Sequence, residues 1–198
     1  SAAGADLDGD GLGEVLIVQR GDEGTSAYLF YGGKLSYDSI HVDGLVENAG
    51  LIIEDLETLD AWTVLSLPGA LGSAGAMGIN DGDDLLIFSG NHQGTTSLDE
   101  ISALRISDLD VTSTAISEDF DGDGVSDLVA GGGDLDTAYL LPGPLISDMA
   151  PSDATATVDE AKQFASAGDS NGDGYLDLAW SHGADGARVQ YGPLSGTV

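Results

Sequence analysis

The sequence predicts an all-β fold made of about four similar units, and three features of the chain support this prediction. Apolar residues occur in short runs, such as 15–18, 85–88 and 138–141, which are bounded by Gly, Asp, Ser and Pro. Runs of this kind are typical of strands joined by turns. The 30 glycines are about twice the usual share of ~7% and flank these runs. An Asp-Gly-rich phrase recurs along the chain, which indicates an internally repeated architecture.

The composition excludes several classes of protein. The 198 residues contain 35 Asp and Glu against five Lys and Arg, which gives a formal net charge of −30. Because phosphates must be met by clustered cations, we expect neither a nucleic acid nor an anionic membrane surface as a partner. The chain has no cysteine and therefore no disulfide, zinc–thiolate site or cysteine nucleophile. No apolar run approaches the ~18 residues that a membrane-spanning helix needs, and residues 1–4 do not resemble a secretion signal.

Three stretches of the chain align with one another, namely 4–17, 117–130 and 167–180. Each contains a loop that opens with an acidic residue, at Asp6, Asp119 or Asp169, and a strand-like apolar run follows the loop. The last two loops start 50 residues apart and the first two 113 apart, so one further unit fits between the first two. A second strand-like run then ends in a glycine phrase: Tyr31-Gly32-Gly33, Leu141-Pro142-Gly143-Pro144-Leu145 or Tyr191-Gly192-Pro193-Leu194.

The additional unit is predicted around residues 78–90, where an Asp-Gly-Asp core precedes a strand but the loop is shortened. For the loop Asn80–Asp84 a plain turn is the default interpretation and metal binding the alternative. We interpret residues 45–72 as an insertion or an eroded strand pair.

A period of roughly 50 residues with four short strands per unit is the signature of a β-propeller, in which each unit is one blade. The predicted fold is therefore a β-propeller, or a propeller segment of about four four-stranded blades with Asp-rich loops. The chain forms one domain, 1–198, or part of a larger one. The approximate repeats are 1–45, 46–112, 113–160 and 161–198, the last incomplete, and candidate outer strands are 39–42 and 154–158.

The acidic loops have the chemistry of metal sites. Oxygen-bearing side chains recur at positions one, three, five and nine, counted from the first acidic residue, and glycines at positions four and six allow the curl that would point them at one centre. The backbone carbonyl of position seven would add a ligand. Hard oxygen ligands without nitrogen or sulfur favour Ca²⁺ over zinc or copper, and Mg²⁺ prefers to keep its waters. We predict about three Ca²⁺ ions, held by Asp6, Asp8, Asp10, Leu12 and Glu14; by Asp119, Asp121, Asp123, Val125 and Asp127; and by Asp169, Asn171, Asp173, Tyr175 and Asp177.

Two other interpretations of the loops can be weighed against the sequence. A helix–loop–helix calcium site begins with a similar phrase but requires a Glu at position twelve and a helix after it. Position twelve is Ile17, Ala130 or Trp180, inside a strand-like run, so this interpretation fails in all three loops. Isolated Asp-Gly runs can simply form turns. Three copies that all keep an acid at position nine favour calcium, and bound ions should stabilise the fold because the clustered carboxylates otherwise repel one another.

These residues resemble the FG-GAP repeat of integrin α-subunit β-propellers and of many bacterial surface and secreted proteins. Its calcium phrase, Asp-x-Asn-Gly-Asp-Gly-x-x-Asp-Leu, is matched most closely by 169–178, and the loops at 6–14 and 119–127 differ from it mainly at Glu14. The phrase 191–197 is similar to bacterial members. The resemblance implies calcium loops that join the first two strands of each blade at one rim, while ligands engage elsewhere. It also implies a secreted or cell-surface location.

No catalytic constellation is evident in the sequence, and we expect no enzyme activity. We expect Trp62 and Trp180 to pack in or between sheets. The remaining candidates are His41, His92 and His182, which form no spaced pair; Ser66, Ser73 and Ser89, which lie outside a Gly-x-Ser-x-Gly elbow; and Glu54, Asp55, Glu57 and Asp60, which are interpreted as a solvated face.

The expected function is that of a calcium-stabilised extracellular module that mediates adhesion or protein–protein interaction. One alternative is a structural subunit of a surface assembly joined through open blade edges. Another is a carbohydrate-binding propeller, which predicts exposed aromatic residues in each blade. Tyr28, Tyr139 and Val189 are predicted to occupy equivalent places but resemble core strand positions. A third alternative is an accessory domain of a secreted enzyme.

Overall fold

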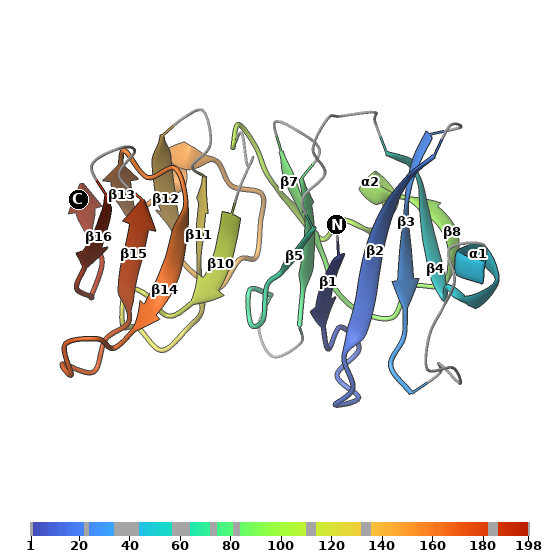
Figure 1. Ribbon diagram of the computed structural model, residues 1–198, viewed down its shortest axis with the longest axis horizontal. Coiled ribbons are helices and arrows are strands. Elements are labelled where there is room, and N and C mark those ends of the chain that lie inside the picture. The colour runs from blue at the N-terminus through green and yellow to red at the C-terminus, as the bar shows by residue number, and fades with distance from the viewer. Residues whose placement is uncertain are drawn as a thin grey trace.

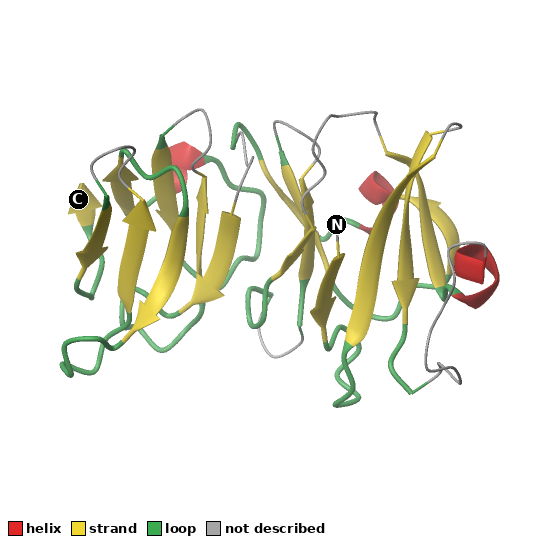
Figure 2. Ribbon diagram, in the orientation of Figure 1, coloured by secondary structure: helices red, strands yellow, loops and turns green. Residues whose placement is uncertain are grey.

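The computed structural model describes residues 2–21, 24–33, 44–56, 64–71, 75–80, 84–109, 114–131, 136–181 and 186–197, and their fold is all-β. Figure 2 shows strands throughout, with helix confined to short segments. These segments are α1 (Leu45–Asn48), α2 (Leu98–Ile101) and the 3₁₀ turn η3 (Pro151–Asp153). Within the described ranges, no helix has the length and apolar character needed to cross a membrane.

The strands form four sheets, which we call A to D. Sheet A has the order β1 (Ala2–Ala5), β2 (Glu14–Gly21), β3 (Gly24–Phe30), β4 (Leu51–Leu56) and β8 (Gly94–Ser97). Sheet B has the order β5 (Val64–Ser66), β6 (Met77–Asn80), β7 (Leu85–Phe88) and β9 (Leu104–Ile106). Sheet C has the order β10 (Thr114–Glu118), β11 (Asp127–Gly131), β12 (Thr137–Leu141), β13 (Ala156–Asp159) and β17 (Gly196–Thr197). Sheet D consists of β14 (Phe164–Gly168), β15 (Asp177–Ser181) and β16 (Ala187–Gln190).

The sheets follow one another in chain order, with sheet A at one end of the molecule and sheet D at the other (Figure 1). Three apolar cores lie between them, the first joining A to B, the second B to C and the third C to D. Alternate residues of a strand point to opposite faces, so the central strands must supply apolar residues to two cores. In sheet B this is complete, because every residue of β6 and β7 is buried.

Consecutive sheets are also joined by backbone hydrogen bonds. The segment that follows the third strand of a sheet reaches back and pairs in parallel with the outer strand of the preceding sheet. In this way β8 pairs with β4, Met149 bridges Ile106 of β9, and β17 pairs with β13. The same step is therefore made three times along the row.

The outer strands differ in part from the sequence prediction. The outer antiparallel strand of sheet A is β4, which pairs with β3 and lies beyond the predicted boundary at residue 45. The segment 45–72 therefore contains α1, the last antiparallel strand of sheet A and the first strand of sheet B. The candidate strand at 154–158 corresponds to β13, whereas 39–42 lies outside the described residues.

Two further predictions differ from the structure. The reason is the same, because strand pairing depends on residues far apart in the chain. The loop Asn80–Asp84 was predicted as a shortened copy of the acidic loops, but β6 ends at Asn80 and β7 begins at Leu85, so it follows the second strand of its sheet and not the first. Residues 196–197, at the end of the repeat that was predicted to be incomplete, pair with β13 of sheet C.

Candidate metal centres in three acidic loops

Three acidic loops connect the first strand of a sheet to the second, as predicted. They join β1 to β2, β10 to β11 and β14 to β15, and all three lie along the lower edge of the molecule in Figure 1. Antiparallel neighbours place both strand ends at the same edge of the sheet, so each loop must reverse the chain over a short distance. This geometry decides how the repeated Asp and Gly residues are used.

The first residue of each loop organises the reversal. Its carboxylate accepts hydrogen bonds from the backbone N–H groups of the glycines at positions four and six. These bonds are Gly9 N–Asp6 Oδ1 (2.8 Å) and Gly11 N–Asp6 Oδ2 (3.0 Å); Gly122 N–Asp119 Oδ1 (2.8 Å) and Gly124 N–Asp119 Oδ2 (3.0 Å); and Gly172 N–Asp169 Oδ1 (2.7 Å) and Gly174 N–Asp169 Oδ2 (2.9 Å). One side chain thereby holds two points of the loop.

The glycines are required by the backbone conformation. At positions four and six the φ angles are +77° and +85° in the first loop, +82° and +89° in the second, and +81° and +94° in the third. L side chains rarely adopt these angles, because the Cβ atom then crowds the backbone. The expectation that these glycines permit a tight curl is confirmed.

Positions three and five each accept a further hydrogen bond from the backbone two residues ahead. The side-chain oxygen of position three accepts from the N–H of position five, and that of position five accepts from the N–H of position seven. In the second loop these are Asp123 N–Asp121 Oδ1 (3.0 Å) and Val125 N–Asp123 Oδ1 (2.8 Å). The other loops repeat them within a few tenths of an ångström, at Asp10–Asp8, Leu12–Asp10, Asp173–Asn171 and Tyr175–Asp173.

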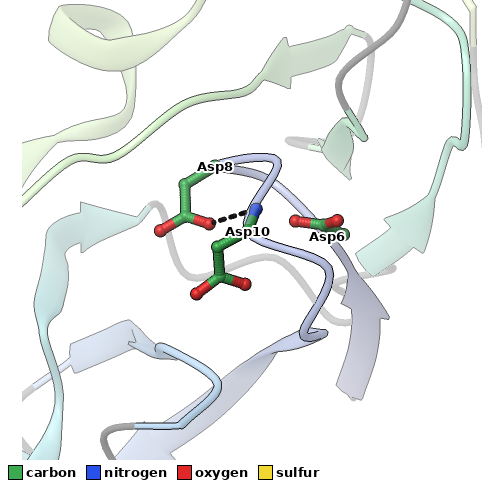
Figure 3. Close-up of side chains that lie close together, drawn as sticks. All are labelled: Asp6, Asp8 and Asp10. Carbon is green, nitrogen blue, oxygen red and sulfur yellow. Dashed lines mark hydrogen bonds between the residues drawn. The ribbon is translucent and has the colours of Figure 1, made fainter.

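Two of the loops bring three carboxylates together. Oxygens of Asp6, Asp8 and Asp10 lie within 4.8 Å of one another, and so do oxygens of Asp119, Asp121 and Asp127. Figure 3 shows Asp8 and Asp10 side by side, with Asp6 entering from the start of the loop. Either cluster has the size and the donor chemistry to hold a cation between its oxygens.

The third loop differs at its third position. Asn171 replaces an acid there, and its Nδ2 donates to Asp173 Oδ2 at 2.8 Å. This loop therefore offers a neutral amide oxygen where the other two offer a charged one. The backbone of the three loops is nevertheless held by the same bonds.

The acid at position nine is buried and binds the backbone in two places. Glu14, Asp127 and Asp177 are at most 1% exposed. Each accepts from the N–H of position two and, with its other oxygen, from the glycine of the phrase after the third strand. The two bonds are 2.5 and 3.2 Å for Glu14 (from Leu7 and Gly32), 2.9 and 2.9 Å for Asp127 (from Phe120 and Gly143), and 2.8 and 3.0 Å for Asp177 (from Ser170 and Gly192).

This link explains why the glycine phrase recurs. A Cβ atom on Gly143 would lie 2.1 Å from the Ser126 carbonyl oxygen, and one on Gly192 would lie 2.4 Å from that of Leu176. Only glycine lets the end of the third strand approach the loop closely enough to donate to the acid. Position nine was predicted as a metal ligand alone, and its bond to the phrase glycine was not predicted from the sequence. The signal was available, because the acid and the phrase recur together.

The environment of the ninth-position acid differs between sheets C and D. Burial raises the pKa of Asp127 above its ordinary value, although three backbone N–H groups act against this. The Ser170 hydroxyl, which donates to Asp177, lowers the pKa of that carboxyl below its ordinary value. A buried charge costs free energy unless hydrogen bonds compensate it. The Ser170 hydroxyl gives Asp177 an additional hydrogen bond that favours the charged carboxylate, and Asp127 has no such hydroxyl.

The other predicted site residues lie where the loops place them. Leu12, Val125 and Tyr175 occupy position seven, each with its N–H bonded to position five, and ligation by their carbonyls stays a prediction. The carboxylate of Asp123 is bonded in the same way as that of Asp10. Twelve of the fifteen predicted metal residues lie in the loops between the strands, and the other three, Glu14, Asp127 and Asp177, are the first residues of β2, β11 and β15.

Among the residues that were considered as catalytic candidates and not chosen, His92 is held by hydrogen bonds to its neighbours. One ring nitrogen lies 2.8 Å from the Ser89 carbonyl oxygen, and its own carbonyl accepts from the Tyr31 hydroxyl. Burial raises the pKa of Tyr31. Trp180 packs in the core between sheets C and D, as expected. His41, His182, Glu57, Asp60, Trp62, Ser73 and the side chain of Asp55 lie outside the described residues.

Strand register corrects one predicted equivalence. Tyr28 pairs with Ile17 and Tyr139 with Ala130, and the corresponding pair in sheet D is Trp180 with Arg188. The residue equivalent to the two tyrosines is therefore Arg188 and not Val189. No aromatic side chain occupies this place in sheet D.

No protein-family model matches the chain, and a search of curated proteins finds no match either. The interpretation of the loops therefore depends on their residues and geometry.

Proposed function

We propose that the chain is a calcium-stabilised β-propeller segment of the FG-GAP type, with sheets A to D as consecutive blades. The observation that carries the proposal is the convergence of three carboxylates within 4.8 Å in each of two loops that have the same internal hydrogen bonds. Like charges at this distance repel, and a divalent cation between them turns repulsion into attraction. The resemblance to the family's calcium phrase supports the same conclusion.

Calcium suits these loops better than other metals. Every side-chain donor is a hard carboxylate or amide oxygen, without imidazole or thiolate. The loops also offer several oxygens from one short segment, as irregular calcium coordination allows, whereas Mg²⁺ demands near-ideal geometry and retains water. We propose about three ions, with the ligands named in the sequence analysis and with position seven contributing its carbonyl.

The ninth-position acid connects the proposed ion site to the rest of the sheet. In sheet C, Asp127 belongs to the carboxylate cluster and also holds Gly143 at the end of the third strand. A cation at the cluster therefore acts on both the loop and the strand pairing. This supports a stabilising role for calcium and not a catalytic one.

The biological role that we propose is an extracellular module for adhesion or protein–protein interaction, without catalysis. Millimolar calcium outside cells would fill even weak sites of this kind. The net charge of −30 supports a protein that is kept well hydrated and is neutralised in part by bound cations. Ligands would engage surfaces other than the acidic loops.

A second candidate is a structural subunit of a surface assembly, favoured by the open edge of sheet D. Among the described residues, β16 pairs with β15 on one side and with no strand on the other. Such an edge offers backbone donors and acceptors to another chain. A carbohydrate-binding role receives less support, because sheet D has Arg188 at the position of Tyr28 and Tyr139. An accessory role beside a catalytic domain is compatible with the same fold.

Thermal unfolding with added Ca²⁺ and with a chelator tests the proposal, together with a count of bound metal. We expect about three ions per chain and a melting temperature that rises by several degrees or more with calcium. Asp8→Ala and Asp121→Ala should each remove one ion. Asp159→Ala, which removes an exposed acid from β13, is the matched control and should leave the count unchanged. Absence of bound calcium would show that the loops are ordinary turns.

A further inference from the structure

The segment after the third strand of a sheet is hydrogen bonded to a loop of the sheet before it. In sheet D the N–H of Leu194 donates to the carbonyl of Phe120, position two of the second acidic loop, at 2.9 Å. Sheets C and B make the same step, from Leu145 N to Ala70 O (3.3 Å) and from Gly90 N to Leu7 O (3.0 Å). In each of these three cases, the loop between the first two strands of a sheet is held by the sheet that follows.

The second acidic loop has a further contact with sheet D, through the side chain of Tyr175. A Cβ atom on Gly122, position four of that loop, would lie 2.5 Å from Cε1 and 2.7 Å from Cδ1 of Tyr175. The tyrosine ring therefore lies directly against this glycine, although Tyr175 belongs to the third loop, where it is position seven. Away from the loops, the Ser166 hydroxyl of β14 donates to the Glu118 carboxylate of β10, so the strands that enter the two loops are joined as well.

Both points that sheet D contacts take part in the curl of the second loop. The N–H of Gly122 donates to Asp119, and the N–H of Phe120 donates to Asp127. Asp119 and Asp127 belong to the carboxylate cluster of this loop. Sheet D thus holds the backbone groups that position two of the proposed ligands.

The groups of sheet D that make these contacts are themselves held by acids of the third loop. Asp173 accepts from the N–H of Tyr175 at 2.9 Å, and Asp177 accepts from the N–H of Gly192, two residues before Leu194, at 3.0 Å. Both acids are predicted ligands of the third ion. An ordered third loop therefore holds Tyr175 and the glycine phrase in place, and these in turn hold the second loop.

We propose that the second and third acidic loops bind calcium cooperatively, so that an ion in either loop strengthens binding in the other. Binding must order a loop whose carboxylates otherwise repel one another, and this ordering costs conformational entropy. Because the two loops share Tyr175 and the glycine phrase of sheet D, ordering one loop lowers the cost of ordering the other. Thermodynamic linkage makes the coupling reciprocal. The inference rests on the proposed function.

Repulsion between the two ions opposes this coupling only weakly. The predicted ligands include four acids in the second loop and three in the third, so each loop keeps a net negative charge after it binds one Ca²⁺. An ion that enters either loop still meets an excess of carboxylates. In 0.15 M salt, exposed charges more than about 8 Å apart are also largely screened.

The first acidic loop provides an internal reference. Its position two, Leu7, accepts from Gly90 of sheet B, and Gly75 of sheet B donates to the carbonyl of Asp6 at 2.8 Å. The loop between β5 and β6, residues 67–76, contains no Asp or Glu and so has no carboxylate cluster of its own. The first ion is therefore expected to bind without this coupling.

Isothermal titration calorimetry with Ca²⁺ in 0.15 M salt tests the proposal, with the first site removed by Asp8→Ala so that two sites remain. In this background, Asp173→Ala removes the third site and Asp121→Ala removes the second. Each change should raise the Kd of the remaining site by about fivefold or more, compared with the second ion to bind in the chain that has both sites. The two factors should agree, because the coupling is reciprocal.

Tyr175→Ala separates coupling from ligation. The change removes the ring that lies on Gly122 but keeps the backbone carbonyl, which is the predicted ligand at position seven. Both sites should still bind calcium, while the coupling factor falls toward one. Leu12→Ala is the matched control, because Leu12 is position seven of the first loop and its side chain lies against Gly32 and Gly33 of its own sheet. It should leave the coupling of the other two sites unchanged.

Several results would overturn the inference. Three ions that bind with no coupling between the second and third sites would do so and leave the proposed function standing, as would an ion in one loop that weakens binding in the other. Ser166→Ala, which removes the bond to Glu118 outside both loops, is a second variant if Tyr175→Ala does not fold, and coupling unchanged in both also contradicts the inference. A wild-type chain that binds no calcium in these loops would contradict the proposed function, and this inference with it.

Discussion

The loops of sheets C and D are curled by the same backbone hydrogen bonds but lie in different surroundings. Position two is Phe120 in sheet C, fully buried in the core beneath sheet D, and Ser170 in sheet D, which is exposed. The neighbouring acids respond in opposite directions, since the pKa of Asp127 is raised by burial and that of Asp177 is lowered by the Ser170 hydroxyl. The curl of the loop is therefore common to both sheets, whereas the pKa of its buried acid depends on burial and on the residue at position two.

The largest effect on the free energy of unfolding is expected when position two of the sheet C loop, Phe120, is changed to the serine found in sheet D. Phe120→Ser removes a fully buried ring from the third core and should destabilise the fold by about 3–5 kcal/mol, as large-to-small core changes do. Denaturant unfolding measures this loss. The reciprocal change, Ser170→Phe, loses one hydroxyl bond at an exposed position and should cost clearly less than Phe120→Ser. Equal losses from the two variants would refute the distinction between the loops.

A smaller effect is expected at the phrase glycine of sheet C. Gly143→Ala would place a Cβ atom 2.1 Å from the Ser126 carbonyl oxygen, so the third strand must move away from Asp127. Overpacking of this kind costs about 1–3 kcal/mol. Gly13→Ala is the matched control, because a Cβ atom there meets nothing within 4 Å and its φ is not positive. The denaturant midpoint of the Gly143 variant should fall clearly below that of the Gly13 variant. An unchanged midpoint for the Gly143 variant would contradict the role of the Gly143–Asp127 hydrogen bond.

The change Asn171→Asp gives the third loop the acid that the first loop has at position three. An additional carboxylate near the proposed cation should strengthen calcium binding by about 1 kcal/mol, or roughly fivefold in Kd. The same change should lower the stability of the calcium-free protein, because it adds repulsion to Asp169 and Asp173. Isothermal titration calorimetry and chelator-treated unfolding measure the two effects separately. If calcium affinity fell instead, the amide would be the better ligand in this loop.

The smallest effect is expected at Glu100, where a hydroxyl lowers a carboxyl pKa as Ser170 does for Asp177, but away from the acidic loops. The Thr96 hydroxyl and then the Ser97 backbone N–H hold the pKa of Glu100 below its ordinary value of 4.5. A lowered folded-state pKa contributes stability above the ordinary value, and this is lost as the pH falls through the folded value. Glu100→Gln should therefore flatten the stability profile slightly between neutral pH and pH below 4.5, with little change at the acid end.

The local geometry of the loops was predictable because it uses short-range chemistry. An Asp that accepts bonds three and five residues ahead needs glycine at both places, so the phrase itself specifies the curl. The all-β class and the strands after each loop followed from the short apolar runs in the same way. In both of the first two loops the acids at positions one and three come together, whereas the third member of the cluster differs, being Asp10 at position five in one and Asp127 at position nine in the other.

Other features depended on contacts between residues far apart in the chain. The sequence does not say that Asp127 accepts from Gly143, sixteen residues away, or that β17 pairs with β13 and not with its own sheet. The outer strand β4 was displaced from its predicted place because its partner is chosen by pairing across a long connection. A nine-residue loop can be specified by its own side chains, but burial and strand order are set by which surfaces meet, and only the tertiary structure decides that.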